Sequence, residues 1–149
     1  MKYYVISGEP SGDLHGSKLM RGIAACDADA KFRFCGGDRM ANIAGKDAML
    51  YHYTQMSFFG FVQVAMNLRT IFRQISDVKR DIEQFRPDVV ILIDYPAFNL
   101  RIAKWAKGRG IRVHYYIAPK VWAWKERRVK KLRKYVDRLY TIFPFETEY

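Results

Sequence analysis

Two carboxylates in a glycine-bearing turn are the first residues in this sequence whose types and spacing suit chemistry. Glu9 and Asp13 lie in residues 7–13, beside Gly8 and Gly12, between an expected strand and an expected helix. In open α/β folds such a turn brings backbone N–H groups and the positive end of a helix to a ligand. The carboxylates would repel a pyrophosphate, the glycines do not follow G-x-G-x-x-G, and no lysine follows as in a Walker loop. The turn suits the hydroxyl and amide groups of a sugar.

A second candidate for chemistry is Asp94, which follows the uninterrupted apolar run at residues 89–93. A carboxylate at the end of such a run is partly desolvated, and this makes it a better general base. The alternative is that Asp94 caps a helix or forms a turn ahead of Pro96. From the isolated residue, this second explanation is favoured.

The three histidines are rival candidates for a base, because an unperturbed imidazole titrates near neutrality. His15 lies one turn into the first expected helix and is placed to reach the turn at residues 7–13. His52 lies in the weakest strand candidate, and His114 lies inside an expected strand. No pair has the spacing of metal ligands, so we expect no metal site.

The expected elements alternate between short apolar runs and longer amphipathic ones. Strands are predicted at residues 2–6, 31–35, 89–93, 112–117 and 138–143, with a weaker candidate at 48–53. Helices are predicted at residues 14–25, 61–85, 99–107 and 125–135. This alternation predicts an α/β fold, a Rossmann-like parallel sheet with helices on both faces. Ligands of such sheets bind outside the carboxyl ends of the strands, here at residues 8–13, 94–99 and 118–124.

Composition narrows the class of protein. The 149 residues, half of them hydrophobic, suffice for one domain with a substantial core. Cys26 and Cys35 have neither metal-ligand nor CxxC spacing, and the first residues do not resemble a secretion signal. These features indicate a reducing, cytoplasmic setting. No apolar run approaches the roughly 18–20 residues that span a bilayer.

Positive charge is concentrated in one part of the chain. Residues 101–138 contain fourteen Lys and Arg but only Glu126 and Asp137 as acids, a local net charge of +12 within a total of +11. Such a patch suits nucleic acid, anionic lipid head groups or a phosphorylated ligand, and charge alone does not choose among them. A solvated helix face is the remaining alternative.

Residues 56–72 carry more apolar surface than one buried helix face requires. Exposed apolar side chains flanked by arginines would suit a membrane interface or acyl chains, with ordinary core packing as the alternative. The basic segment at residues 125–134 would add attraction to an anionic leaflet. The residues predicted to contact lipid are Phe58, Phe59, Phe61, Val62, Met66, Arg69, Phe72 and Arg73.

Five motifs occur in one order and spacing along the whole chain. They are Gly8-Glu9-x-Ser11-Gly12-Asp13, Gly36-Gly37-x-Arg39-Met40, Pro87-Asp88 with Ile93-Asp94-x-Pro96-x-Phe98-Asn99, His114-Tyr115 with Pro119-x-Val121-Trp122-Ala123-Trp124, and Pro144-Phe145-Glu146. The string Val-Trp-Ala-Trp is the most unusual part. Together the motifs resemble the lipid-A-disaccharide synthase family, inverting glycosyltransferases of the GT-B fold from Gram-negative bacteria.

The resemblance implies a hexosyltransferase reaction in lipid A and lipopolysaccharide biosynthesis. The family transfers 2,3-diacylglucosamine from its UDP derivative to 2,3-diacylglucosamine 1-phosphate (lipid X), which gives a β-1,6-linked disaccharide 1-phosphate and UDP. Asp94 matches the family's proposed base, and Glu9, Ser11 and Asp13 match first-loop residues that would bind or orient the acceptor sugar. Asn99 is expected to be a further polar contact with the acceptor. The UDP-sugar is a substrate, so no cofactor is expected. The implied partners are both acylated sugars and the inner-leaflet membrane surface, to which a cytoplasmic enzyme binds peripherally, without nucleic acid.

The resemblance also implies a division into domains. Residues 1–149 match the N-terminal, acceptor-side domain of a GT-B enzyme, and the donor-binding C-terminal domain lies outside this sequence. The isolated chain is therefore expected to be inactive, to bind the acceptor weakly and to bind UDP hardly at all.

The sequence departs from the family pattern at four positions. Pro10, Asp38, Ala97 and Lys120 stand where members commonly carry Ala, Pro, Asp and Ser. Ala97 leaves Asp94 as the only carboxylate of the central loop. Lys120 either meets the acceptor phosphate or is solvated.

Two alternative functions remain open from the residues. One is a basic module that binds nucleic acid through stacking and phosphate contacts, with a steep salt dependence. The other is a GT-B enzyme with a water-soluble sugar acceptor, which has no reason to bind liposomes.

Overall fold

A computed structural model describes residues 1–58, 61–117 and 126–141, and among these residues the strands form one parallel sheet in the order β3-β2-β1-β4-β5-β6. The strands are β1 (Lys2–Ser7), β2 (Lys31–Gly36), β3 (Met49–His52), β4 (Val89–Ile93), β5 (Arg112–Tyr116) and β6 (Arg138–Tyr140). The helices are α1 (Pro10–Cys26), α2 (Asp38–Ala44), the 3-10 helix η1 (Lys46–Ala48), α3 (Tyr53–Met56), α4 (Phe61–Met66), α5 (Leu68–Phe85), α6 (Pro96–Gly108) and α8 (Glu126–Tyr135).

Strand β4 forms the centre of the sheet. It pairs in parallel with β1 on one side and β5 on the other, and all five of its residues are buried. Val90 and Leu92 contribute to one core, while Val89, Ile91 and Ile93 contribute to the other. A strand buried on both faces has to be apolar throughout, as its β-branched and leucine sequence is. The strand predicted at residues 89–93 is confirmed with the same bounds.

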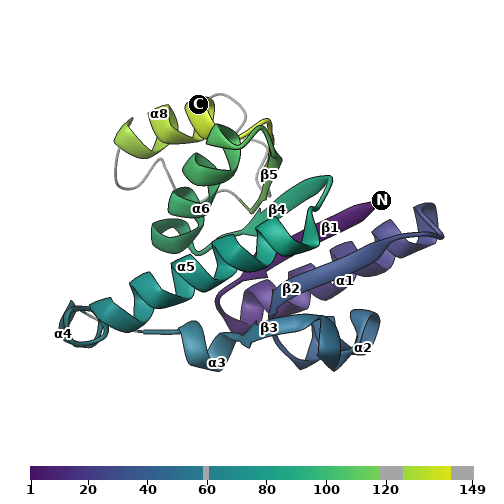
Figure 1. Cartoon of the computed structure of the whole chain (residues 1–149), viewed down its shortest axis with the longest axis horizontal. Helices are drawn as coiled ribbons and strands as arrows, with labels where there is room; N and C mark the ends of the chain where they lie inside the picture. The colour runs from purple at the N-terminus through teal and green to yellow at the C-terminus, as the bar shows by residue number, and fades with distance from the viewer. Residues whose placement is uncertain (59–60, 118–125, 142–149) are drawn as a thin grey trace.

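Helices cover both faces of the sheet, as predicted. One core joins the sheet to α5, α6 and α8 through side chains such as Val78, Ile102 and Leu132, and the other joins it to α1 and α2 through Met20 and Met40. Figure 1 shows α5, α6 and α8 side by side, with α1 and α2 together on the other side of the strands.

The segment predicted as one helix at residues 61–85 is interrupted. Asn67 lies between α4 and α5 with φ of −112°, and its side chain donates a hydrogen bond of 2.7 Å to the Gln63 carbonyl. An asparagine that bonds to a nearby backbone group competes with the helix pattern, which explains the break. Helix α5 ends at Phe85, and its C-cap residue Arg86 adopts the left-handed conformation before Pro87.

The other differences concern short elements. The weak strand candidate at residues 48–53 is confirmed as β3, but α2 and α3 beside it were not predicted. Strand β6 occupies residues 138–140 of the predicted 138–143, and Ile142 and Phe143 lie outside the described residues. The carboxyl ends of the parallel strands place Gly8, Gly37, Asp94 and Ile117 at one edge of the sheet. The predicted loop at residues 118–124, with Lys120, Trp122 and Trp124, lies outside the described residues.

Candidate functional site

The turn that follows β4 has an unusual backbone. Asp94 and Tyr95 both have positive φ values, 44° and 49°, directly after the buried strand and before α6. Left-handed backbone is unfavourable for residues with a Cβ, least so for Asp, and two in a row persist only where the surroundings hold them. The turn leaves Asp94 half-buried at the carboxyl edge, where the sequence predicted a base.

Two side chains hold the backbone of this turn. Asn99, from the first turn of α6, donates through Nδ2 to the Asp94 carbonyl at 2.8 Å and to the Ile93 carbonyl at 3.3 Å. The Tyr115 hydroxyl, from β5, donates to the same Asp94 carbonyl. Asn99 is fully buried and positions the Asp94 backbone through Nδ2, while its Oδ1 has no hydrogen-bond partner among the described residues. The acceptor contact expected of Asn99 stays a prediction.

Tyr95 links the β4 turn to the first turn of the chain. Its ring lies so close to Gly8 that a Cβ on Gly8 would come within 2.5 Å of it, and its hydroxyl donates to the Met56 carbonyl at 2.7 Å. Glycine is therefore required at position 8 for a close approach between the loops. The role of Tyr95 was not predicted, although its place beside Asp94 in a loop at the carboxyl edge was a usable signal.

The contact between these loops places two carboxyl groups together. Partial burial raises the pKa of Glu9, and the Asp94 charge and a hydrogen bond with the Asp94 side chain raise it further. Glu9 is the N-cap residue of α1 but makes no side-chain capping bond, so its carboxyl is directed to this pair. The site thus presents two neighbouring carboxyl groups whose oxygens are placed to accept a hydrogen bond from a hydroxyl group.

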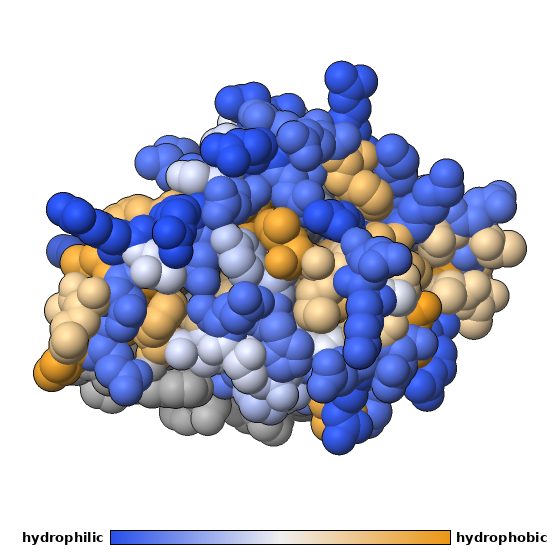
Figure 2. All heavy atoms as spheres, turned by 60° about the horizontal axis from the view of Figure 1, so that its bottom comes forward, coloured by the Kyte–Doolittle hydropathy of each residue, from blue (hydrophilic) through white to orange (hydrophobic). Residues whose placement is uncertain are grey.

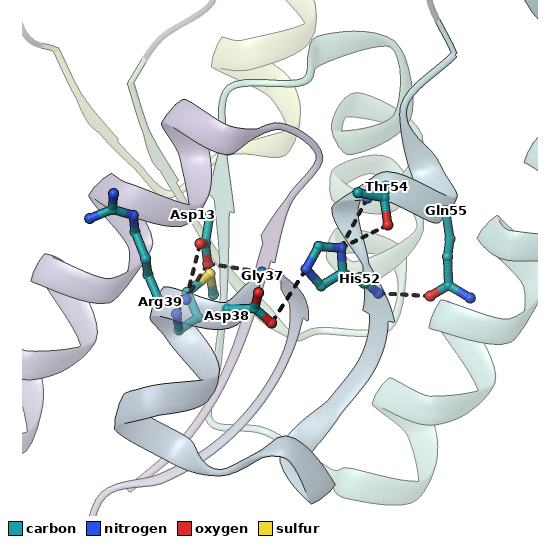
Figure 3. Close-up of polar contacts among 8 residues, drawn as sticks. Asp13, Gly37, Asp38, Arg39, His52, Thr54 and Gln55 are labelled. Atoms are coloured by element: carbon teal, nitrogen blue, oxygen red, sulfur yellow. Dashed lines mark hydrogen bonds and ion pairs between the residues drawn. The ribbon is translucent and has the colours of Figure 1, made fainter.

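Ser11 and Asp13 follow in the first turn of α1 and differ in exposure. Ser11 is exposed at the carboxyl edge, as an acceptor-binding residue needs to be. Asp13 is only 3% exposed and accepts backbone N–H bonds from Gly37 at 2.8 Å, Arg39 at 3.1 Å and Met40 at 3.1 Å. Figure 3 shows this carboxylate at the start of α2. Asp13 thus fixes the start of α2, and the sugar contact expected of it stays a prediction.

The histidines lie outside the carboxyl pair. His15 packs edge-on against the Tyr116 ring, with 6.2 Å between centroids. His52 accepts from the Thr54 backbone to cap α3 and lies 3.6 Å from the Asp38 carboxylate (Figure 3). Burial, with Arg138 and Arg112 nearby, lowers the pKa of His114, which lies within β5.

Several predicted lipid-contact residues are exposed. Val62 is 72% exposed, Met66 80% and Phe72 49%, and Arg69 and Arg73 are exposed beside them. We call these side chains on α4 and the start of α5 the apolar lip. Figure 2 shows orange and tan atoms at the left end of the molecule, where α4 lies in Figure 1, with blue side chains next to them.

The other predicted lipid-contact residues are less informative. Phe58 is half-buried. Phe59 and the side chain of Phe61 lie outside the described part of the chain. Within that part, no helix combines the length and the apolar character needed to cross a bilayer.

Comparison with known proteins assigns the family. The sequence profile of the family described as lipid-A-disaccharide synthetase matches residues 3–149. The chain belongs to this family. A lipid-A-disaccharide synthase from Geobacter metallireducens is 41% identical over 145 residues, which is 97% of this chain, and one from Coxiella burnetii is 39% identical over 142 residues, which is 95%. The chain spans 37% of the length of each relative.

Solved structures support the fold of this lipid-A-disaccharide synthetase family member. A putative UDP-N-acetylglucosamine 2-epimerase from Listeria monocytogenes matches with a TM-score of 0.67 at 10% identity, over 99% of this chain and 40% of that one. The UDP-GlcNAc 2-epimerase from Methanocaldococcus jannaschii matches with a TM-score of 0.66 at 12% identity, over 99% and 41%. The predicted N-terminal half of a GT-B fold is confirmed.

The role of Asp13 predicts a stability change. In Asp13→Asn, Oδ1 can still accept from Gly37 and Met40, but the part-buried Arg39 N–H faces an amide nitrogen that cannot accept its bond, so we expect about 2 kcal/mol of destabilisation. Urea denaturation would measure it. Asp29→Asn is the control, because Asp29 is exposed, and it should change stability by less than about 0.5 kcal/mol. Equal stability of the two variants would contradict the role of Asp13.

The carboxyl pair predicts a pH-dependent effect of Glu9→Gln. The pKa of Glu9 is raised in the folded protein, so the folded protein binds a proton at Glu9 more tightly than the unfolded chain does. The free energy of unfolding therefore falls as the pH rises from the pKa of Glu9 in the unfolded chain through its raised pKa in the folded protein. Glutamine never ionises and avoids the loss. Glu9→Gln should melt at a higher temperature than the parent at pH 7, with the difference shrinking towards about pH 4. A difference independent of pH in thermal melts would rule out the pair.

Proposed function

We propose that the complete protein transfers 2,3-diacylglucosamine from UDP-2,3-diacylglucosamine to the 6-hydroxyl of 2,3-diacylglucosamine 1-phosphate. This chain supplies the acceptor side of that inverting glycosyltransferase. The observation that carries the proposal is the Glu9–Asp94 carboxyl pair at the carboxyl edge of the sheet, in a chain of this family. The curated relatives are named for the same reaction.

The pair acts as the general base in a single displacement. Asp94 accepts the proton of the acceptor hydroxyl while the hydroxyl oxygen attacks the anomeric carbon of the donor and UDP leaves on the opposite face. Glu9 assists by holding the Asp94 side chain through a hydrogen bond. Ser11 contacts the acceptor sugar, whereas Asp13 and Asn99 position the loops around it.

The donor belongs to the remainder of the protein in this proposal. The chain spans 37% of its curated relatives, and the described carboxyl edge presents acids that would repel a pyrophosphate. UDP is therefore bound mainly outside residues 1–149, and this segment alone is inactive. The reaction uses no resident metal or cofactor.

The apolar lip is the proposed contact with acyl chains and with the inner-leaflet surface. Val62 and Met66 expose apolar side chains, and Arg69 and Arg73 lie where they meet anionic head groups. Lys130 and Lys134, exposed cations of α8, add about 1 kcal/mol each where they approach the surface. The protein thus binds the membrane peripherally.

The role of Asp94 predicts a loss of turnover. In the complete protein, Asp94→Asn keeps the shape of the side chain but removes the base, and we expect kcat to fall about 10²–10⁴-fold with little change in acceptor binding. Steady-state assays of UDP release would measure this. Asp29→Asn, an exposed control on the opposite edge, should retain parental turnover. Near-normal kcat in Asp94→Asn would remove Asp94 from its role.

The apolar lip predicts a loss of membrane binding. Val62→Ser with Met66→Ser removes apolar surface without touching the core, and flotation with phosphatidylglycerol vesicles should show at least about tenfold weaker binding. Ala24→Ser with Ala28→Ser, both exposed on the far side of the sheet, is the control. Failure of the parent protein to float with vesicles would contradict the membrane contact and would favour the alternative of an enzyme with a water-soluble sugar acceptor.

A further inference from the structure

A groove separates α6 from α8 on the outer surface of the molecule. The two helices meet through the buried Leu132, and beyond this contact a cavity of about 590 Å³ opens between them. Pro96 lines the end nearest the carboxyl edge, and Tyr135 lines the groove from the last turn of α8. We call this cavity the α6–α8 groove.

The described lining of this groove carries one sign of charge. Its charged side chains are Arg101, Lys104, Arg127, Arg128 and Lys131, and none of its described lining residues is acidic. Cations that repel one another in a concave site create a positive potential that attracts an anion.

Neighbouring cations are neutralised, unlike those of the groove. Lys107 pairs with Asp137, and Arg109 pairs with Glu83. Among the described residues, no carboxylate forms an ion pair with any of the five groove cations. Within the described part of the chain, two helices thus contribute guanidinium and ammonium groups that no carboxylate neutralises. Arginine matches phosphate oxygens with two parallel N–H bonds, and lysine adds a point charge.

The groove begins next to the proposed base. Pro96 and Ala97, which line it, directly follow the Asp94–Tyr95 turn that carries the base. In a hexopyranose, C1 and the C5 that bears C6 flank the ring oxygen, and the 1-substituent and the 6-hydroxyl extend from the ring in different directions. A sugar with its 6-hydroxyl at Asp94 can therefore direct a 1-substituent into the groove, away from the carboxyl pair.

We propose that the α6–α8 groove is a phosphomonoester site, which holds the phosphate on the anomeric carbon of the acceptor sugar. The inference rests on the proposed function and extends it by naming residues that select a phosphorylated acceptor. Arg127 and Arg128 lie at the end of α8 that is nearest the carboxyl edge and supply bidentate contacts, while Lys131 and Lys104 supply charge deeper in the groove.

The test compares two variants of the complete protein. Arg127→Gln with Lys131→Gln removes two exposed groove cations, and glutamine keeps the helix propensity of α8. Lys18→Gln with Arg21→Gln removes the same charge from the exposed face of α1 and is the control. Glucosamine 1-phosphate is the binding probe, followed by ³¹P line broadening. The groove variant should bind it about 10- to 100-fold more weakly, and the control should match the parent.

Kinetics separates this inference from the proposed function. With the phosphorylated acceptor, the groove variant should show a KM raised about 10- to 100-fold and a nearly unchanged kcat. With the phosphate-free diacylglucosamine, its kcat/KM should equal that of the parent. An unchanged KM for the phosphorylated acceptor would overturn the groove assignment and leave the glycosyltransferase proposal standing. The complete parent protein could catalyse no sugar transfer, while the groove variant binds glucosamine 1-phosphate more weakly than the parent and the control do. In that case the proposed function fails and the phosphate site stands.

Vesicles distinguish the two sources of phosphate. Phosphatidylglycerol vesicles should bind the groove variant no more weakly than they bind the Lys18→Gln, Arg21→Gln control. A groove variant that binds vesicles more weakly than the control does, but binds glucosamine 1-phosphate as tightly as the parent, would show that the groove recognises lipid head groups. That result would overturn our assignment to the acceptor phosphate.

Discussion

The left-handed turn at Asp94 and Tyr95 is the constraint on which the candidate site depends. Each residue with positive φ costs roughly 1–3 kcal/mol, so the turn needs support from outside its own segment. That support comes from the Asn99 amide, the Tyr115 hydroxyl and the bond from the Tyr95 hydroxyl to the Met56 carbonyl. Because the same turn packs the Tyr95 ring on Gly8 and brings Asp94 to Glu9, the base exists only when the whole sheet edge is assembled.

The features that could be predicted from the sequence are those set by residues near one another in the chain. Strand β4 was predicted with its observed bounds because its pattern is local, five apolar residues after Pro87-Asp88. Asp94 was identifiable as the residue that ends this strand. The pairing of Asp94 with Glu9 could not be identified from the sequence. The direction of the Asp94 side chain depends on a turn that is held by hydrogen bonds from Asn99 in α6 and Tyr115 in β5, and no local sequence pattern contains these bonds. Sequence therefore located the site but not its internal geometry.

Asp13 and Asn99 show why polar residues in the correct loops are ambiguous. Both lie at the carboxyl edge and both have side chains suited to a sugar, yet each is buried against backbone groups. For Asp13 the difference depends on α2, which was not predicted and whose first N–H groups it accepts. Ser11, which shares the first turn of α1 with Asp13, is exposed. The position of a residue in a loop predicts that it lies near a ligand. Whether its side chain can contact the ligand depends on its burial and on which of its polar atoms are already hydrogen-bonded to neighbouring groups.

Three surfaces of different character meet around this edge, and their arrangement orients an amphiphilic ligand. The carboxyl pair repels an anion, the α6–α8 groove attracts one, and the exposed apolar side chains of the lip favour acyl chains over charged groups. At 4 Å and an effective dielectric constant of 20, one charge pair is worth about 4 kcal/mol, so reversing a sugar phosphate would exchange attraction for repulsion of that order. Arg101 joins two of these surfaces, because it lines the groove and its guanidinium lies 5.1 Å from the centre of the Phe72 ring on the lip. In the proposed complex, the acyl chains contact the apolar lip, the phosphate lies in the α6–α8 groove and the reacting hydroxyl lies at the carboxyl pair. Only this orientation of the acceptor places its 6-hydroxyl beside Asp94.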